Sequence, residues 1–254
     1  MAEVIHHRML AGLRFIDANS GLLVNNGLVV SAPGLKIVRN RLGLYALLAN
    51  RTGAPPGPTL ELTVTDQGSH YWGRRFTLAL PRDSDPSHVA NGDSLFRPVD
   101  ILLFRRPTAP APPDWALIQA TVVDGTGRPL PAALLRVQRT INGVLTTVAQ
   151  ALTAWQGHIL GEAIMGVPAL PVAISNDEDG DGGSGNGGEG EAPVLIFEVP
   201  AVLDVVVDPT FVATANALPD PDQLIANRAT LPSTTMNIQL RRGQPLTTTL
   251  TVAL

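Results

Sequence analysis

The 254-residue sequence contains no cysteine, few aromatic residues (4%) and few charged residues (16%). Without cysteine, the chain has neither a disulfide framework nor thiolate-based zinc sites. Runs of the roughly 18 or more consecutive apolar residues that a membrane-spanning helix needs are also missing, so we expect no membrane span. Residues 1–12 lack the apolar core of a secretory signal, which predicts cytoplasmic synthesis.

Glycine and proline are abundant by contrast, with 24 and 22 residues respectively. Proline interrupts helices and glycine weakens them, so this composition argues against long helices. It favours many short strands joined by turns, and the hydrophobic fraction of 44% is sufficient for buried cores. We therefore predict an all-β protein of two Ig-like or transthyretin-like β-sandwiches in tandem, with only short helical turns.

The net charge of −4 is unevenly distributed. Without the six acidic residues between 177 and 191, the remaining chain carries about +2. A nearly neutral body lacks the basic footprint of a nucleic-acid-binding protein, so we expect no nucleic-acid partner. The six are Asp177, Glu178, Asp179, Asp181, Glu189 and Glu191.

Local patterns indicate strands, hairpins and two helical turns. Apolar and polar residues alternate from Thr59 to Asp66, which is typical of a half-buried strand. The Asn-Gly pairs at 26–27 and 142–143 suit the positive φ angles of hairpin turns. Asp85-Pro86 and Asp220-Pro221 each predict the capped start of a short helical turn.

A proline-rich segment divides the chain. Four prolines between 107 and 113 predict a semi-rigid, extended linker at 105–114. We expect an N-terminal arm at 1–11, one β-sandwich domain at 12–104 and a second at 115–254. Residues 176–193 read as a flexible, acidic, glycine-rich insertion in the second domain.

The two halves share an internal order of features. In each half, a strand ends in an aspartate, which is Asp17 in the first half and Asp124 in the second. A turn with glycine, further strand sequence, a second glycine and another strand then follow. The glycines of the first turns are Gly21 and Gly127. Because the aspartates recur at matched positions, we expect their side chains to cap turns rather than to serve catalysis. Tandem domains follow from a repeat of this length.

The string from Ala120 to Val137, with Asp124-Gly125-Thr126-Gly127-Arg128-Pro129 at its centre, resembles the start of a carboxypeptidase-regulatory-like (transthyretin-like) domain. The resemblance covers roughly 115–175 well and 12–80 more loosely, and it implies an Ig-like sandwich rather than an activity. Leu13 to Asp17, Asn40 to Tyr45 and Phe96 to Asp100 look similar to accessory proteins of contractile phage-tail-like injection systems. That resemblance implies a component of such a particle.

One acidic stretch matches the first half of a calcium-binding loop. Asp177, Asp179 and Asp181 followed by Gly182 fit the D-x-D-x-D-G pattern, in which alternate carboxylates converge on one ion. The acid expected at loop position twelve falls on Gly188, and the many surrounding glycines make ordering costly. The favoured interpretation is a solvated insertion without a cofactor; calcium is the alternative.

Two short strings resemble a serine hydrolase. Gly92-Asp93-Ser94-Leu95 spells the signature of GDSL hydrolases, and Asp85 to His88 spells D-x-x-H. In that family the Asp and His follow far downstream on an α/β fold, whereas here they precede Ser94 in an all-β chain. We therefore predict a protein that is not an enzyme.

The best candidate contact surface is the segment from His70 to Phe76, which gathers aromatic and arginine side chains. Tyr71, Trp72, Arg74 and Arg75 are typical of residues that anchor a protein partner. An alternative is a carbohydrate-binding module in which Tyr71, Trp72 and Trp155 stack on sugar rings. A purely structural role is equally consistent with the sequence: Tyr71 and Phe76 would then lie in the core, and the two arginines would be solvated.

Taken together, these observations favour a non-catalytic structural or adaptor protein within a larger protein assembly, with homo-oligomers included among its partners. A glycan-binding or other surface-binding module is the alternative, and a GDSL-like hydrolase is a more remote one. Exposed edge strands and loops of β-sandwiches suit protein contacts of this kind.

Overall fold

The computed structural model describes residues 7–50, 57–168, 173–174, 195–196, 198–214 and 216–254. Strands dominate these residues, and the one α-helix, α1 (Pro221–Ala226), is a short one capped by Asp220. The predicted all-β sandwich class is therefore confirmed. Within the described residues, no helix is long and apolar enough to cross a membrane.

Seven strands form the N-terminal sandwich: β1 (His7–Asp17), β2 (Leu28–Ser31), β3 (Lys36–Arg39), β4 (Tyr45–Asn50), β5 (Thr59–Asp66), β6 (Arg74–Ala79) and β7 (Val99–Leu103). One sheet has the order β3-β4-β1-β7 and the other β2-β5-β6. Their inner faces share a core that includes Leu13, Phe15, Leu47, Leu62 and Phe76. The turn Pro86–His88 is capped by Asp85, as predicted.

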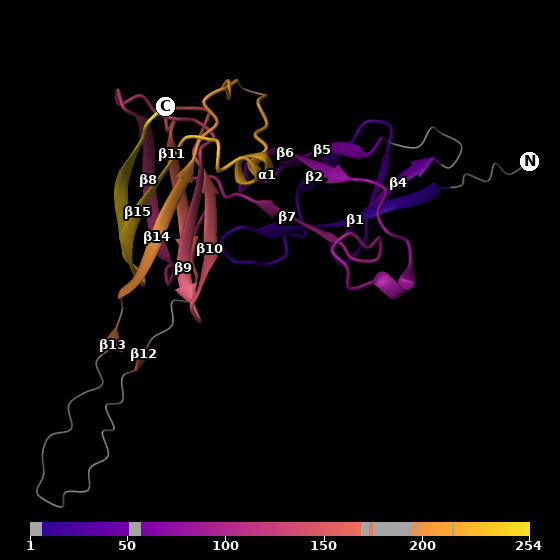
Figure 1. Ribbon diagram of the computed structural model, residues 1–254, viewed down its shortest axis with the longest axis horizontal. Coiled ribbons are helices and arrows are strands. Elements are labelled where there is room, and N and C mark those ends of the chain that lie inside the picture. The colour runs from indigo at the N-terminus through magenta and orange to yellow at the C-terminus, as the bar shows by residue number, and fades with distance from the viewer. Residues whose placement is uncertain (1–6, 51–56, 169–172, 175–194, 197, 215) are drawn as a thin grey trace, which may run out of the picture.

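Seven further strands form the C-terminal sandwich: β8 (Ala116–Asp124), β9 (Leu134–Ile141), β10 (Val144–Leu152), β11 (Glu162–Val167), β14 (Glu198–Val206), β15 (Ser233–Arg241) and β16 (Pro245–Val252). The sheet orders are β10-β9-β14-β15 and β11-β8-β16. A separate antiparallel pair joins β12 (Ala173–Ile174) to β13 (Leu195–Ile196). Figure 1 shows the strands of the two sandwiches running in different directions, with α1 between them.

The two sandwiches are closed in the same way. β1 pairs antiparallel with β4 and parallel with β7, while β8 pairs antiparallel with β11 and parallel with β16. Asp17 at the end of β1 lies opposite Leu103, and Asp124 at the end of β8 lies opposite Val252. The repeat read from the sequence thus corresponds to matched strand positions.

Both aspartates cap the turns that follow them, as predicted. Asp17 Oδ1 accepts the backbone N–H groups of Asn19 and Ser20 at 2.8 and 2.9 Å. Asp124 Oδ1 accepts those of Thr126 and Arg128 at 2.8 and 2.9 Å. These bonds satisfy backbone donors where the strand ladder stops.

The two Asn-Gly predictions have different outcomes. Asn142 and Gly143 both have positive φ and connect β9 to β10, so this hairpin is confirmed. The segment at 25–27 does not close a hairpin, and that prediction is wrong. It carries the chain from Leu23, which pairs with β1, across to β2, which pairs with β5 in the other sheet.

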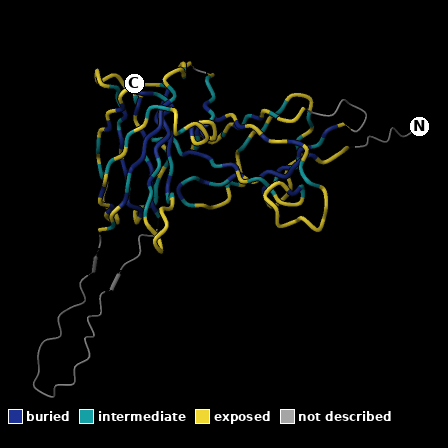
Figure 2. The backbone as a smooth tube through the Cα atoms, in the orientation of Figure 1, coloured by how far each residue is buried: buried dark blue, intermediate teal, exposed yellow. Residues whose placement is uncertain are grey.

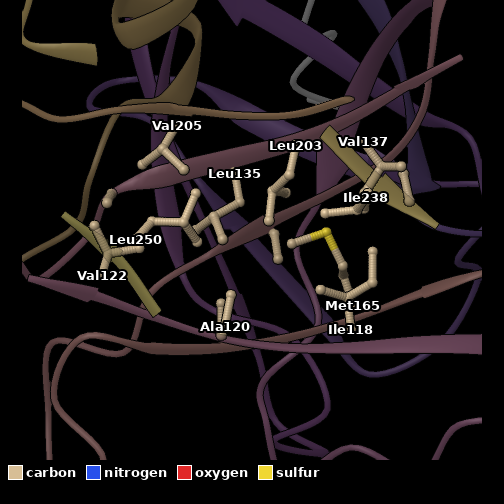
Figure 3. Packing of buried hydrophobic residues seen from close by; sticks show 14 of the residues in the cluster. Ile118, Ala120, Val122, Leu135, Val137, Met165, Leu203, Val205, Ile238 and Leu250 are labelled. Atoms are coloured by element: carbon tan, nitrogen blue, oxygen red, sulfur yellow. The ribbon is translucent and has the colours of Figure 1, made fainter. Parts of the chain in front are cut away.

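Apolar side chains of both C-terminal sheets meet in a continuous core. Figure 3 shows Ile118 of β8 beside Met165 of β11 and Val122 of β8 beside Leu250 of β16, with Leu203 and Val205 of β14 across the core from them. Figure 2 shows the buried backbone running through the middle of both sandwiches, with exposed segments at the loops.

A buried charge cluster lies on the outer face of β9 and β14. Asp204 is completely buried and accepts hydrogen bonds from Arg136 Nε and Nη2 at 3.0 and 2.5 Å. Arg228, which follows α1, also donates to both Asp204 oxygens. Although burial opposes ionisation, these arginines lower the pKa of Asp204. The cluster therefore fastens the α1 region to the sheet.

Gly166 on β11 has no room for a side chain. A Cβ atom there would lie 2.2 Å from Cε3 of Trp115, whereas at Gly125 nothing lies within 4 Å. We expect Gly166→Ala to lower the free energy of unfolding by about 1–3 kcal/mol, the usual cost of overpacking. Urea unfolding followed by circular dichroism measures this change. Gly125→Ala is the matched control and should leave stability nearly unchanged; equal effects of the two variants would contradict the packing at Trp115.

Candidate functional site: the junction between the sandwiches

The segment predicted to contact a partner lies at the junction between the two sandwiches. Trp72 is only 5% exposed and Arg74 is fully buried, while Tyr71 is half-buried and Arg75 is exposed. Trp72 and Arg74 make their contacts inside the chain, so their assignment to a partner-binding surface is corrected. For Tyr71 and Arg75, partner binding stays a prediction.

Aromatic side chains from both sandwiches pack against each other at the junction. The rings of Trp72 and Trp155 lie 4.3 Å apart between centroids, and Phe211 meets Trp155 edge-on at 6.3 Å. Trp155 Nε1 donates to the carbonyl oxygen of Ala217 at 3.1 Å. Because both tryptophans are buried against each other, neither offers a face to a sugar ring, and the predicted stacking of Trp72 and Trp155 on glycans is wrong. Other buried members are Phe104, Ala132, Leu134, Leu152, Ala154 and Leu224.

Arg74 joins the two sandwiches through its guanidinium group. Its Nη1 donates to the carbonyl oxygen of Leu102 on β7 at 2.9 Å, and its Nη2 donates to Asp222 on α1. The carboxylate of Asp220, the cap of α1, lies 3.9 Å from the same Nη2. The guanidinium also lies over the ring of Phe104 at 5.6 Å.

The ionisation of this group follows from its surroundings. Burial lowers the pKa of Arg74, while Asp222 and Asp220 act in the opposite direction. Burial likewise raises the pKa of Asp220. A buried guanidinium that loses its carboxylate partner is strongly unfavourable, so the pairing holds α1 in place against the N-terminal sandwich.

Asp17 connects its own turn to the junction. Its Oδ2 accepts a hydrogen bond from the Tyr71 hydroxyl at 2.7 Å and one from Arg105 Nε at 2.6 Å. Burial opposes its ionisation, but hydrogen bonds from Ser20, Tyr71 and Asn19 and the charge of Arg105 together lower the pKa of Asp17. Burial and the nearby Asp17 carboxylate raise the pKa of Tyr71. Asp17 is therefore an ionised centre that is only 2% exposed.

The start of the proline-rich segment is part of the same junction. Arg106 donates its backbone N–H to His70 at 2.8 Å and its Nε to the carbonyl of Tyr71 at 3.0 Å, and its guanidinium lies 4.6 Å from the Trp72 ring centroid. Arg105 lies 5.0 Å from the ring centroid of Trp115. These contacts bind the predicted linker to both sandwiches.

A cleft of about 590 Å³ opens beside the junction. Glu61, Arg75 and Thr77 line it from the N-terminal sandwich, and Asp220 and Gln223 are among its residues from the C-terminal one. Arg75 Nη1 lies 3.9 Å from Glu61, so its cation is partly paired within the cleft. The lining therefore offers hydrogen-bond donors and acceptors, and side chains of both charges, to a polar partner.

The residues that resemble a serine hydrolase differ in their exposure to solvent, so they do not form one site. Ser94 is fully buried, and its Oγ accepts the backbone N–H of Phe96 at 3.3 Å. His88 Nδ1 lies 2.6 Å from Asp83, and His88 itself is exposed. A nucleophile needs contact with both substrate and base, and a buried hydroxyl with a structural acceptor role does not supply it.

The candidate calcium ligands Asp177, Asp179 and Asp181 lie outside the described residues, so the calcium alternative stays a prediction. In the part of the chain that the structure describes, no three His, Asp or Glu side chains are grouped as metal ligands.

Comparisons with known proteins bring no family assignment: no family model matches the chain, and no curated protein does. Three solved structures are similar to it: a streptococcal ancillary pilin (TM-score 0.26, 10% identity, 86% of this chain), the Bacillus anthracis TIE protein (0.24, 10%, 100%) and shaft pilin SpaA from Lactobacillus rhamnosus GG (0.24, 9%, 85%). This chain spans 50%, 41% and 68% of them respectively. Because these TM-scores are low, we draw no functional inference from them.

The sequence singles out Trp72, Arg74 and Trp155 as contact residues but does not show that they contact other parts of the same chain. The sequence does carry a signal for Asp220, because Asp220-Pro221 predicts the start of a helical turn. Asp222 lies 148 residues from Arg74, and no local pattern links the two. Arg105 and Arg106 belong to the predicted linker, but in the structure they contact Asp17 and Trp72.

Replacing Trp72 by alanine should remove much of the aromatic contact. We expect Trp72→Ala to lower the free energy of unfolding by about 3–5 kcal/mol, as for other buried tryptophans. The two sandwiches should then unfold in separate transitions in differential scanning calorimetry. Phe96→Ala, at a ring that is 52% exposed, is the control and should keep the wild-type profile. An unchanged profile for Trp72→Ala would rule out a stabilising role for the junction.

Ionised Asp17 should make stability depend on pH. Because its pKa is lowered in the folded chain, its stabilisation is present above the unfolded-state pKa and is lost as pH falls through the folded-state pKa. The difference in urea midpoint between wild type and Asp17→Asn should therefore be large at about pH 7 and shrink towards about pH 3. A difference that stays constant over this range would contradict the ionised state.

Proposed function

We propose that this chain is a non-catalytic structural adaptor that holds proteins together in a larger assembly. The observation that carries the proposal is the junction, where Trp72 packs against Trp155 and the buried Arg74 pairs with Asp222. Adjacent domains joined only by a linker move freely, whereas an apolar, ion-paired interface holds their orientation. A fixed orientation suits a protein that sets the spacing between partners.

The side chains suited to binding also support a structural role. Trp72, Trp155 and Arg74 are the residues that would anchor a ligand if they were exposed, and here they are used between the sandwiches. What remains for partners is the outer surface of the four main sheets, including their edges. Sheet surfaces and edges engage other proteins through extended contacts rather than through catalysis.

A more specific role is membership of a contractile phage-tail-like injection particle, with synthesis in the cytoplasm before assembly. Its support is the resemblance of the stretches at 13–17, 40–45 and 96–100 to accessory proteins of such particles. In the structure these stretches belong to one sheet and its flanking loops: β1, the turn before β4, and the loop entering β7.

The test is the native mass of the tagged chain in extracts of its own host. We expect the protein to elute far above its monomer mass of 26.8 kDa, together with partners in fixed stoichiometry. Trp72→Ala should reduce this incorporation, and Leu22→Ala, at a turn residue that is 70% exposed, should not. Elution of the wild type as a free monomer would overturn the proposal, and tail-like particles under the electron microscope would support the specific role.

A further inference from the structure

One sheet of the N-terminal sandwich has an unusually apolar outer face. The register places Met9 of β1, Leu48 of β4 and Lys36 of β3 in one row, and Gly12, Ala46 and Val38 in another. Tyr45, Leu47 and Ala49 of β4 point into the core, so Ala46 and Leu48 point outwards. Met9 is 42% exposed and Val38 41%. We name Met9, Gly12, Val38, Ala46 and Leu48 the apolar face.

Outward residues on two strands of other sheets are polar. On β5 they are Glu61, Thr63 and Thr65, and on β16 they are Thr247, Thr249 and Thr251. A solvated sheet face normally alternates in this way, with apolar residues inside and polar residues outside. An apolar outer face departs from that rule, and contiguous exposed apolar surface commonly marks a contact site.

The apolar face is hollowed and continues around the sheet. One groove of about 360 Å³ is lined by Met9, Gly12, Val38 and Ala46 together with Leu95 and Phe96. A second hollow of about 430 Å³ shares Met9 and Leu95 and adds Arg8 and Arg82. Phe96, which lines the first of these hollows, is 52% exposed. The two hollows offer one continuous surface for a protein partner.

The charges around this surface are basic and mostly unneutralised. Arg8, Lys36 and Arg41 are exposed, and none forms an ion pair with a carboxylate within the described ranges. Arg14 is paired with Asp100, Nε to Oδ1, at 2.5 Å. A partner of this face therefore supplies negative charge as well as apolar contact.

The chain itself has that complementary charge. Residues 1–106 contain twelve Arg or Lys and eight Asp or Glu, a net charge of +4, whereas residues 107–254 contain six and fourteen, a net charge of −8. Six of those fourteen acidic residues belong to the acidic insertion between 177 and 191, which supplies most of this charge. We propose that the apolar face binds the acidic C-terminal half of a second copy of this chain. This inference rests on the assembly function proposed above.

Charge also determines the symmetry of the contact. If two copies met through the same face, their Arg8, Lys36 and Arg41 side chains would oppose one another. A head-to-tail contact instead brings basic and acidic halves together, and such contacts produce rings or filaments. The N-terminal sandwich extends away from the C-terminal one along the long axis in Figure 1, so copies can follow one another end to end.

Sedimentation velocity of the purified full chain, from about 1 to about 200 µM, tests the proposal. We expect concentration-dependent self-association that weakens at least about threefold between about 50 and about 500 mM NaCl. Val38→Glu should weaken it at least about tenfold. Val29→Glu, at a valine that is 44% exposed on β2 of the other N-terminal sheet, is the matched control and should associate like wild type. Thermal unfolding confirms that both variants are folded.

Mixing distinguishes the head-to-tail contact from a symmetric one. Val38→Glu keeps an intact acidic half, so it should still bind the apolar face of wild type and terminate growth, shifting large wild-type species to small ones. A symmetric contact would leave the wild-type species unchanged by the variant, and this result would overturn the proposal. A wild type that stays monomeric at all concentrations would also overturn the proposal. If such a monomeric protein still elutes in a large complex from host extracts, the proposed assembly function stands and only the contact between copies is wrong.

Discussion

The guanidinium group of Arg74 is fully enclosed where β6 meets α1, and its donors reach both sandwiches. A cation at this depth is tolerated only while its partners are in place, because removing one leaves a buried charge that costs several kcal/mol. Leu102 belongs to the N-terminal sandwich and Asp222 to the C-terminal one. The relative orientation of the two sandwiches therefore depends on keeping the hydrogen-bond and ion-pair partners of Arg74 in place.

Neighbouring contacts reinforce this constraint. Trp72 packs against Trp155 near Arg74, and the backbone N–H of Arg106 binds the start of the proline-rich segment to the carbonyl oxygen of His70. Asp17 caps the turn after β1 and also accepts hydrogen bonds from Tyr71 and Arg105. The aspartate-capped turn that recurs in both sandwiches thus also contributes to the junction in the N-terminal one. The Asp17 carboxylate stabilises both this local turn and the long-range contacts.

Much of the fold follows from sequence because its signals are local. Asp17 and Asp124 cap turns through neighbouring N–H groups, and Asn142-Gly143 adopts the positive φ angles that its residues favour. The Asn-Gly pair at 26–27 misleads because the same backbone preference also suits a crossing between sheets. Trp72 and Arg74 look like surface anchors in sequence, since their burial depends on Trp155 and Asp222, which only the tertiary fold brings near.

The central claim is that the junction makes the two sandwiches one rigid body. Because the chain has no cysteine, two introduced cysteines at exposed Ser31 and Thr249 carry spin labels at unique places, one on each sandwich. Double electron–electron resonance then measures the distance between them in the full chain. The account predicts a single narrow distance distribution that broadens when Trp72 is replaced by alanine. A broad distribution in the otherwise unchanged chain would contradict it.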